Sequence, residues 1–138
     1  MLLKRLPKPV LLTLPVIWAG AILAILTMPS SSLPSVEFWG EDKLAHVGLF
    51  FVQMFFVWGA LRYGRGLRLT GSKWTVAIIA VTAFGGVTEI LQGFTPTRSP
   101  DAGDVLADAT GALLFLGAHY IYRRMRFTRA GSSSDHRP

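Results

Sequence analysis

The sequence predicts an all-α membrane protein with four transmembrane helices. Hydrophobic residues make up 51% of the 138-residue chain, which is more apolar side chain than one soluble domain of this length can bury. Four apolar segments are each long enough to cross a hydrocarbon core roughly 30 Å thick, which takes about 20 helical residues. They are residues 10–28, 44–61, 74–92 and 105–122.

The four segments contain few ionisable side chains, namely His46, Glu89, Asp108 and His119. Helices with so few polar residues are apolar nearly all round, which suits lipid and not water. The segments are also too long for the strands of a membrane barrel and lack the alternation of such strands. All four are therefore expected to be lipid-embedded helices.

A basic stretch, Lys4, Arg5 and Lys8, precedes the first segment. Such a start is also typical of a secretory signal. The apolar run is longer than the about 7 to 15 residues of a signal, however, and no small-x-small cleavage site clearly follows it. We therefore predict an uncleaved first span.

Charge is divided between two sets of segment boundaries. Twelve of the fourteen Lys and Arg residues lie before the first segment, between the second and third, and after the fourth, whereas seven of the eight carboxylates lie at the other boundaries. Because cytoplasmic loops are rich in Lys and Arg, both termini are predicted to be cytoplasmic. The other two loops would face outward, with Lys43 and Arg98 as their cations.

Composition also excludes several classes of function. The net charge of +6 does not indicate a nucleic-acid partner, because the basic residues lie at three separate membrane boundaries. The absence of cysteine excludes disulfides, thiolate metal sites and cysteine nucleophiles.

Residues 128–138 are rich in Ser and charge and show no apolar period. They are expected to form a disordered cytoplasmic tail after a transmembrane domain of residues 1–127. Trp58 and Trp74 are expected to anchor the helices at the cytoplasmic headgroups.

Three of the ionisable groups fall at one depth. A rise of about 1.5 Å per residue, counted from the outer ends of spans two, three and four, places each of them about 6 Å below the outer boundary: His46, Glu89 and Asp108. Glu89 lies in the last turn of its helix, where the helix dipole disfavours an anion. It therefore needs a cation, a proton or another compensating partner.

Further polar residues lie within one helical turn of these groups: Asp42 and Lys43 before His46, Gln92 after Glu89, and Asp104 before Asp108. Ala107 and Gly111 give span four a small-xxx-small spacing, and Gly85 and Gly86 give span three a similar flat patch, so neighbouring helices can approach closely. We expect spans two, three and four to pack with these polar stripes inward, while span one closes the bundle.

A loop rich in turn residues joins spans three and four, and its prolines Pro96 and Pro100 restrict it. Arg98 is therefore expected to be held over the polar cluster. With Lys43, it would either bridge Glu89 to the aspartates or hold a phosphate or carboxylate group of a ligand.

Three blocks of the sequence resemble the signature of the VanZ-like membrane proteins, in the order and spacing of that family. The blocks are Asp42-Lys-x-x-His46, Glu89-x-x-Gln92-x-Phe94-x-Pro96-x-Arg98 and Asp104-x-x-x-Asp108-x-x-Gly111. The resemblance covers residues 27–117. It departs at Thr97, where the family usually has Gly, and at Asp108, where it usually has Asn and where this chain adds a negative charge.

The resemblance implies a small helical protein of the bacterial cytoplasmic membrane that takes part in the cell envelope. The founding member of the family is associated with low-level resistance to the glycopeptide teicoplanin. The family supplies the motif but no catalytic residue, so the chemistry has to be argued from the residues themselves.

Three functions fit the polar cluster. In the first, it is a structural network of salt bridges and hydrogen bonds that fixes helix register. In the second, it binds or acts on an envelope lipid or a lipid-linked phosphate or glycan in the outer leaflet, since ionisable groups inside a membrane indicate a functional site. His46, Glu89 and Asp108 would then supply acid–base chemistry, and the substrate would be bound by Asp42, Lys43, Gln92, Arg98 and Asp104.

In the third, an oxygen-rich set with one imidazole holds a divalent metal ion. The ligands would be His46, Glu89, Asp104 and Asp108. The nearby Lys43 and Arg98 count against this alternative, so no cofactor is expected. Transport is not indicated, because Gln53 and the distant His119 are the polar residues that continue below the layer.

Overall fold

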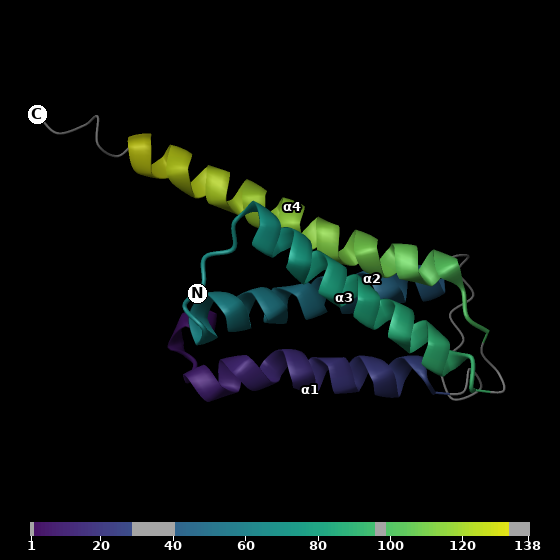
Figure 1. The fold of residues 1–138 in the computed structure, drawn as a ribbon. Helices are drawn as coiled ribbons and strands as arrows, with labels where there is room; N and C mark the ends of the chain where they lie inside the picture. The colour runs from purple at the N-terminus through teal and green to yellow at the C-terminus, as the bar shows by residue number, and fades with distance from the viewer. Residues whose placement is uncertain (1, 29–40, 96–98, 133–138) are drawn as a thin grey trace, which may run out of the picture.

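The computed structural model describes residues 2–28, 41–95 and 99–132, and this part of the chain is helical without strands. Figure 1 shows the helices in order. They are the 3-10 helix η1 (Leu2–Arg5), α1 (Lys8–Leu26), α2 (Glu41–Gly59), the π-helix η3 (Ala60–Gly64), α3 (Gly71–Gln92) and α4 (Ala102–Ser132).

The four predicted spans are confirmed as α1, α2 with η3, α3 and α4, each of which is long and apolar enough to cross a membrane. Helix α4 continues through Thr128 to Ser132, which corrects the expectation of a tail without structure from residue 128. No proline follows the span before Gly131, so nothing in the sequence stops the helix at the membrane boundary. Residues 133–138 lie outside the described residues, and for them the tail stays a prediction.

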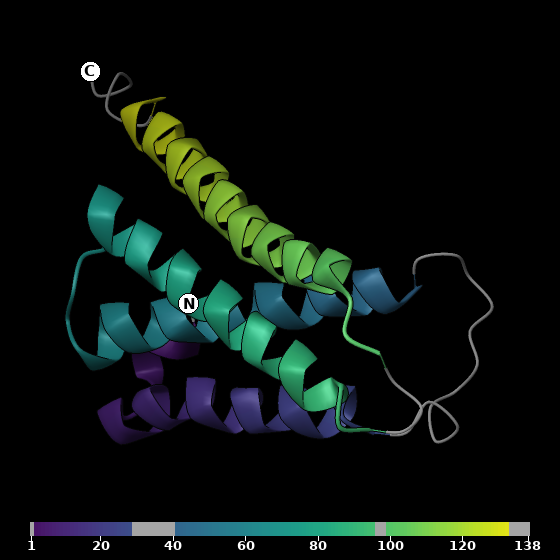
Figure 2. The ribbon, with the colours of Figure 1, turned by 45° about the vertical axis from the view of Figure 1, so that its right-hand side comes forward.

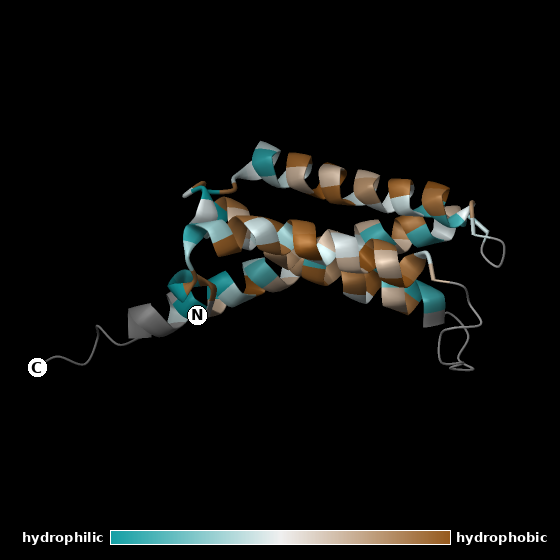
Figure 3. Cartoon of the chain, turned by 90° about the horizontal axis from the view of Figure 1, so that it is seen from below, coloured by the Kyte–Doolittle hydropathy of each residue, from teal (hydrophilic) through white to brown (hydrophobic). Residues whose placement is uncertain are grey.

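The outer faces of the helices are apolar. Val16 on α1 is 71% exposed and Leu106 on α4 is 70% exposed, and apolar residues dominate the middle of the helices while hydrophilic ones gather towards both ends (Figure 3). Side chains of this kind are stable on the outside of a protein when lipid surrounds them. The arrangement is that of a multi-pass membrane protein.

The two ends of the bundle carry opposite charge. Helix η1, the connection from η3 to α3 and the last turns of α4 lie at one end, while α2 and α4 begin and α3 ends at the other (Figures 1 and 2). We call the first the basic end, defined by Lys4, Arg62, Arg68, Arg123 and Arg126. The second is the acidic end, defined by Asp42, Glu89, Asp101, Asp104 and Asp108. The separation of charge that the sequence predicted is thus found in the structure as a basic end and an acidic end of the bundle.

Helices α1 and α4 lie on opposite sides of α2 and α3 (Figures 1 and 2), and α2 packs chiefly against α4. The α2–α4 crossing is close because Gly111 has no side chain. An added Cβ there would lie 2.3 Å from the Val47 carbonyl oxygen. The sequence prediction that small residues of this span permit a close approach is confirmed at Gly111, and this crossing sets the position of the site.

Helix α1 is joined to α2 by two side-chain hydrogen bonds. Trp18 Nε1 donates to the Leu49 carbonyl at 3.0 Å, and Gln53 Nε2 donates to the Pro15 carbonyl at 3.3 Å. Gln53 therefore links two helices through its amide, and it does not extend the polar layer of the acidic end.

Candidate functional site

A buried histidine–aspartate pair forms the centre of the acidic end. His46 of α2 and Asp108 of α4 are both fully buried, and His46 Nδ1 lies 2.8 Å from Asp108 Oδ1. Each stands beside the close α2–α4 crossing, since His46 precedes Val47 and Asp108 is one turn before Gly111. The small residue at the crossing thus places the two polar side chains within hydrogen-bond distance.

Helix α3 approaches the same pair through Gly85. A Cβ at this position would lie 2.1 Å from Asp108 Oδ2, so the carboxylate packs directly on the α3 backbone. Gly86 has open space around it, so of the predicted glycine patch only Gly85 makes the close approach. Three helices therefore meet at Asp108.

Glu89 of α3 lies across from the imidazole. It is 4% exposed, and its Oε1 is 3.8 Å from His46 Nε2. Its other oxygen, Oε2, accepts a hydrogen bond of 2.9 Å from the backbone N–H of Asp101, which directly precedes α4. This N–H is the compensating partner that a carboxylate in the last turn of a helix requires.

Lys43, Asp101 and Asp104 form the rim of the cluster, where the Lys43 and Asp101 side chains are half-exposed and that of Asp104 is buried. Lys43 Nζ lies 2.5 Å from Asp101 Oδ2 and 3.0 Å from Asp104 Oδ1, and the lysine side chain is 50% exposed. Gly103 N–H donates to Asp101 Oδ1 at 2.7 Å. The hydrogen bond from Lys43 holds the pKa of the Asp101 carboxyl below its usual range, and the hydrogen bond from Gly103 lowers this pKa further.

Several buried polar atoms of the cluster have no hydrogen-bond partner among the described protein groups. They are His46 Nε2, Glu89 Oε1, Asp108 Oδ2 and Gln92 Nε2. Such atoms are rare in protein interiors, because each costs about 1–3 kcal/mol of desolvation. Their position on three helices marks where a ligand would find both donors and acceptors.

The structure brings together most of the residues that the sequence singled out. His46, Glu89 and Asp108 lie in one layer, Lys43 and Asp104 pair at its rim, and Gln92 is buried on α3 one turn beyond Glu89. The other two predicted site residues are Asp42 and Arg98. Asp42 is exposed and offers a ligand atom within 4.8 Å of those of His46 and Asp104. Arg98 lies outside the described residues, so its place over the cluster stays a prediction.

Sequence reasoning missed Asp101. This residue connects the rim to the interior, because its side chain binds Lys43 while its N–H binds Glu89. A signal was present, since Asp directly before an apolar helix is typical of the start of that helix. Asp42, His46 and Asp104 offer ligand atoms within 4.8 Å of one another, and Asp108 is hydrogen-bonded to His46 Nδ1. The metal-ligand set expected from the sequence shares His46 and Asp104 with this group, and it stays a prediction.

The comparison with known proteins agrees with the three sequence blocks. No curated protein and no solved structure matches the chain. The model of the VanZ/LLP1 family matches residues 13–123, a stretch that contains most of α1, all of α2, η3 and α3, and α4 as far as Arg123. The motif residues Asp42 to His46, Glu89 to Gln92 and Asp104 to Gly111 lie at the acidic end of this matched region. The chain therefore belongs to the VanZ/LLP1 family.

Proposed function

We propose that this VanZ-like protein lies in the bacterial cytoplasmic membrane with both termini in the cytoplasm and its acidic end in the outer leaflet. There, the polar cluster binds the headgroup of an envelope lipid or of a lipid-linked glycan. Through this ligand the protein changes the susceptibility of the cell to glycopeptides such as teicoplanin.

The charge polarity of the bundle supports the orientation, because the basic end carries Lys and Arg residues from three segments of the chain. The cysteine-free sequence permits a direct test. A single cysteine at Ser99, near the acidic end, should react with an impermeant maleimide on intact cells, and one at Ser72, near the basic end, should react after permeabilisation. The opposite labelling pattern would show that the topology is the reverse of the one proposed.

The geometry of His46 carries the proposal for the site. Asp108 holds Nδ1, and this fixes the ring so that Nε2 points to Glu89 Oε1, 3.8 Å away. Both of these atoms are buried and have no hydrogen-bond partner in the described protein. An imidazole with a carboxylate on one nitrogen and a second carboxylate facing the other is suited to bind a hydroxyl or ammonium group and to exchange a proton with it.

The charge of the cluster favours a ligand rich in hydrogen-bond donors. Its described carboxylates are Asp42, Glu89, Asp101, Asp104 and Asp108. Lys43 is paired with two of them. A bare phosphate would meet mostly negative charge, whereas sugar hydroxyls or an amino group donate to carboxylates. A glycan or amino headgroup therefore fits the described cluster better than the phosphate group that Lys43 was expected to hold.

The test is a conservative change of His46. We expect His46→Gln to weaken binding of a polyprenyl-linked amino sugar by at least about tenfold, because a buried charge-assisted contact is lost. Binding is measured by native mass spectrometry of the full chain, and teicoplanin susceptibility is measured in cells that express each variant. His119→Gln, which changes the other histidine of the described helices, should keep the binding.

If His46→Gln lowers the amount of folded protein or its unfolding temperature in proportion to the lost phenotype, the cluster is a structural network and no binding site. Unchanged binding by a well-folded His46→Gln protein would show that the imidazole does not contact the ligand.

A divalent cation is a second candidate, favoured by the ligand atoms of Asp42, His46 and Asp104, which lie within 4.8 Å of one another. Since Asp108 occupies Nδ1, the other imidazole nitrogen is the one that would bind a metal, as is usual for histidine ligands held by a carboxylate. The pairing of Lys43 with Asp104 opposes it. Elemental analysis of the full chain incubated with Mn²⁺ or Zn²⁺ should find a bound ion that Asp104→Asn removes. An ion retained by that variant would contradict this site.

A further inference from the structure

A cavity of about 700 Å³ opens at the basic end, far from the acidic cluster. It lies between η1, η3, the start of α3 and the last turns of α4. Five cations line it: Lys4, Arg62, Arg68, Arg123 and Arg126. Among the described residues none of the lining side chains is acidic. The cations therefore converge on one volume without a carboxylate in its wall.

The floor of this cavity is a packed aromatic cluster. The His119 ring contacts the rings of Trp58 and Trp74, with centroid distances of 4.9 Å and 5.5 Å. Trp58 is 7% exposed, so it packs inside the bundle, and its expected role as a lipid-facing anchor is wrong. Because these rings join α2, α3 and α4, the floor is part of the folded core and the cavity is preformed.

Local structure places the cations around the floor. Arg62 and Tyr63 lie in the π-helix η3, where one extra residue per turn changes the direction of side chains relative to α2. The Arg62 guanidinium lies 5.7 Å from the centre of the Tyr63 ring, and that of Arg126 lies 5.9 Å from the centre of the Tyr122 ring. These contacts hold positive charge at the wall without neutralising it.

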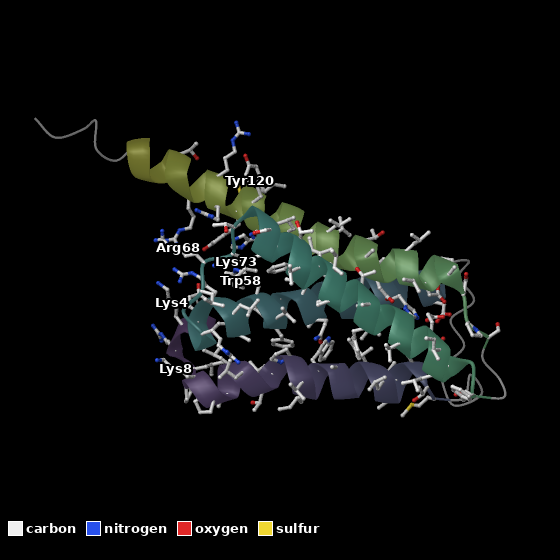
Figure 4. All side chains as sticks on the ribbon, viewed as in Figure 1. Lys4, Lys8, Trp58, Arg68, Lys73 and Tyr120 are labelled. Carbon is white, nitrogen blue, oxygen red and sulfur yellow. The ribbon has the colours of Figure 1, made fainter. Side chains whose placement is uncertain are left out.

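A general excess of cytoplasmic cations does not by itself produce this arrangement. Lys8 and Lys73 lie at the same end of the molecule, as do Lys4 and Arg68 (Figure 4). Only the second pair lines the cavity. The whole end carries an excess of positive charge. Only some of its cations line the cavity above the aromatic rings, so their arrangement does not follow from that excess.

We infer that this cavity binds the phosphate group of an anionic ligand at the membrane surface. Guanidinium groups recognise phosphate with paired N–H donors, and basic pockets between transmembrane helices on the cytoplasmic side are suited to anionic lipid headgroups. The volume exceeds that of a single phosphate, so there is room for the glycerol or sugar part of a headgroup. The same chemistry would accept a soluble phosphate compound, and the experiment separates the two sources.

The experiment measures binding of dihexanoyl phosphatidylglycerol to the full chain in neutral detergent, with inorganic pyrophosphate as a competitor. We expect the double variant Arg62→Gln/Arg123→Gln to bind about tenfold more weakly or worse, because charge-assisted contacts are removed. The matched control Lys8→Gln/Lys73→Gln removes the same charge from the same end but leaves the cavity intact. It should change the affinity by less than about twofold, as screened surface charges do.

Equal losses in the two double variants would overturn the inference, because net charge would then explain the binding. Equal affinity for dihexanoyl phosphatidylcholine would also overturn it. If the cavity variant does not fold, Arg68→Gln, an exposed residue of the connection between η3 and α3, takes its place and should weaken binding severalfold. Displacement by pyrophosphate at a similar concentration assigns a soluble phosphate ligand, and lack of displacement assigns the lipid.

Discussion

The charged side chains at the acidic and basic ends of the bundle have different partners. At the acidic end, charged and polar groups contact one another across helices, as His46 does with Asp108 and Lys43 with Asp101 and Asp104. At the basic end, the cations line an open cavity and meet aromatic rings, with no acidic residue in its described lining. The acidic cluster therefore contributes to the packing of the bundle, whereas the basic cavity depends on an external anion for its counter-charge.

The difference has a physical origin in the helix approach. Gly85 and Gly111 bring three helices together at the acidic end, so polar side chains there lie in a buried layer where an unpaired charge is costly. At the basic end, aromatic rings fill the space between α2, α3 and α4, and the charged groups line an open cavity. Substitutions at the two ends test whether this contrast holds.

The largest effect is expected from Gly111→Leu. The new side chain would overlap the α2 backbone at Val47, a contact that no rotamer relieves. We expect a loss of more than about 3 kcal/mol of stability and little folded protein, because overpacking against backbone cannot relax. The measurement is the yield of monodisperse protein and its unfolding temperature in detergent. Gly117→Leu, on the same helix with open space around it, is the control and should fold. Normal folding of the Gly111 variant would show that the close crossing is dispensable.

A smaller but still large effect is expected from Asp108→Ala. It leaves His46 buried without the partner of its Nδ1, and breaking a buried pair in this way costs about 3–5 kcal/mol. Arg68→Ala at the basic end removes an exposed cation and should leave stability unchanged in the absence of anions. Unfolding temperatures of the two variants in the same detergent provide the comparison. Equal losses would remove the proposed distinction between the two ends.

The smallest effect concerns the rim and depends on pH. The pKa of Asp101 is lowered in the folded protein by Lys43, so its contribution to stability is fully present above the unfolded-state pKa of about 3.9 and is lost as the pH falls through the lower folded value. The difference in unfolding temperature between the wild type and Asp101→Asn should therefore be constant above about pH 5 and should close at lower pH.

In a Lys43→Gln background the same Asp101 substitution should have a smaller effect, because its partner is gone. An unchanged effect would mean that Asp101 acts through its hydrogen bond from Gly103 alone.

The sequence by itself determined the four spans, their polarity of charge and the family motif. Length and hydropathy are properties of each segment alone, and a rise of about 1.5 Å per residue is enough to place His46, Glu89 and Asp108 at one depth. It also indicated where helices approach closely, through Gly85 and Gly111. These inferences need no knowledge of which helix lies beside which.

The tertiary structure decided which of these groups contact one another. It pairs His46 with Asp108, gives Glu89 the backbone N–H of Asp101 and binds Lys43 to two carboxylates at the rim. It also buries Trp58 beneath a basic cavity that no sequence pattern indicated. The physical reason is that depth follows from counting along one helix, whereas contacts depend on the rotation and crossing of several helices, which their packed side chains set together.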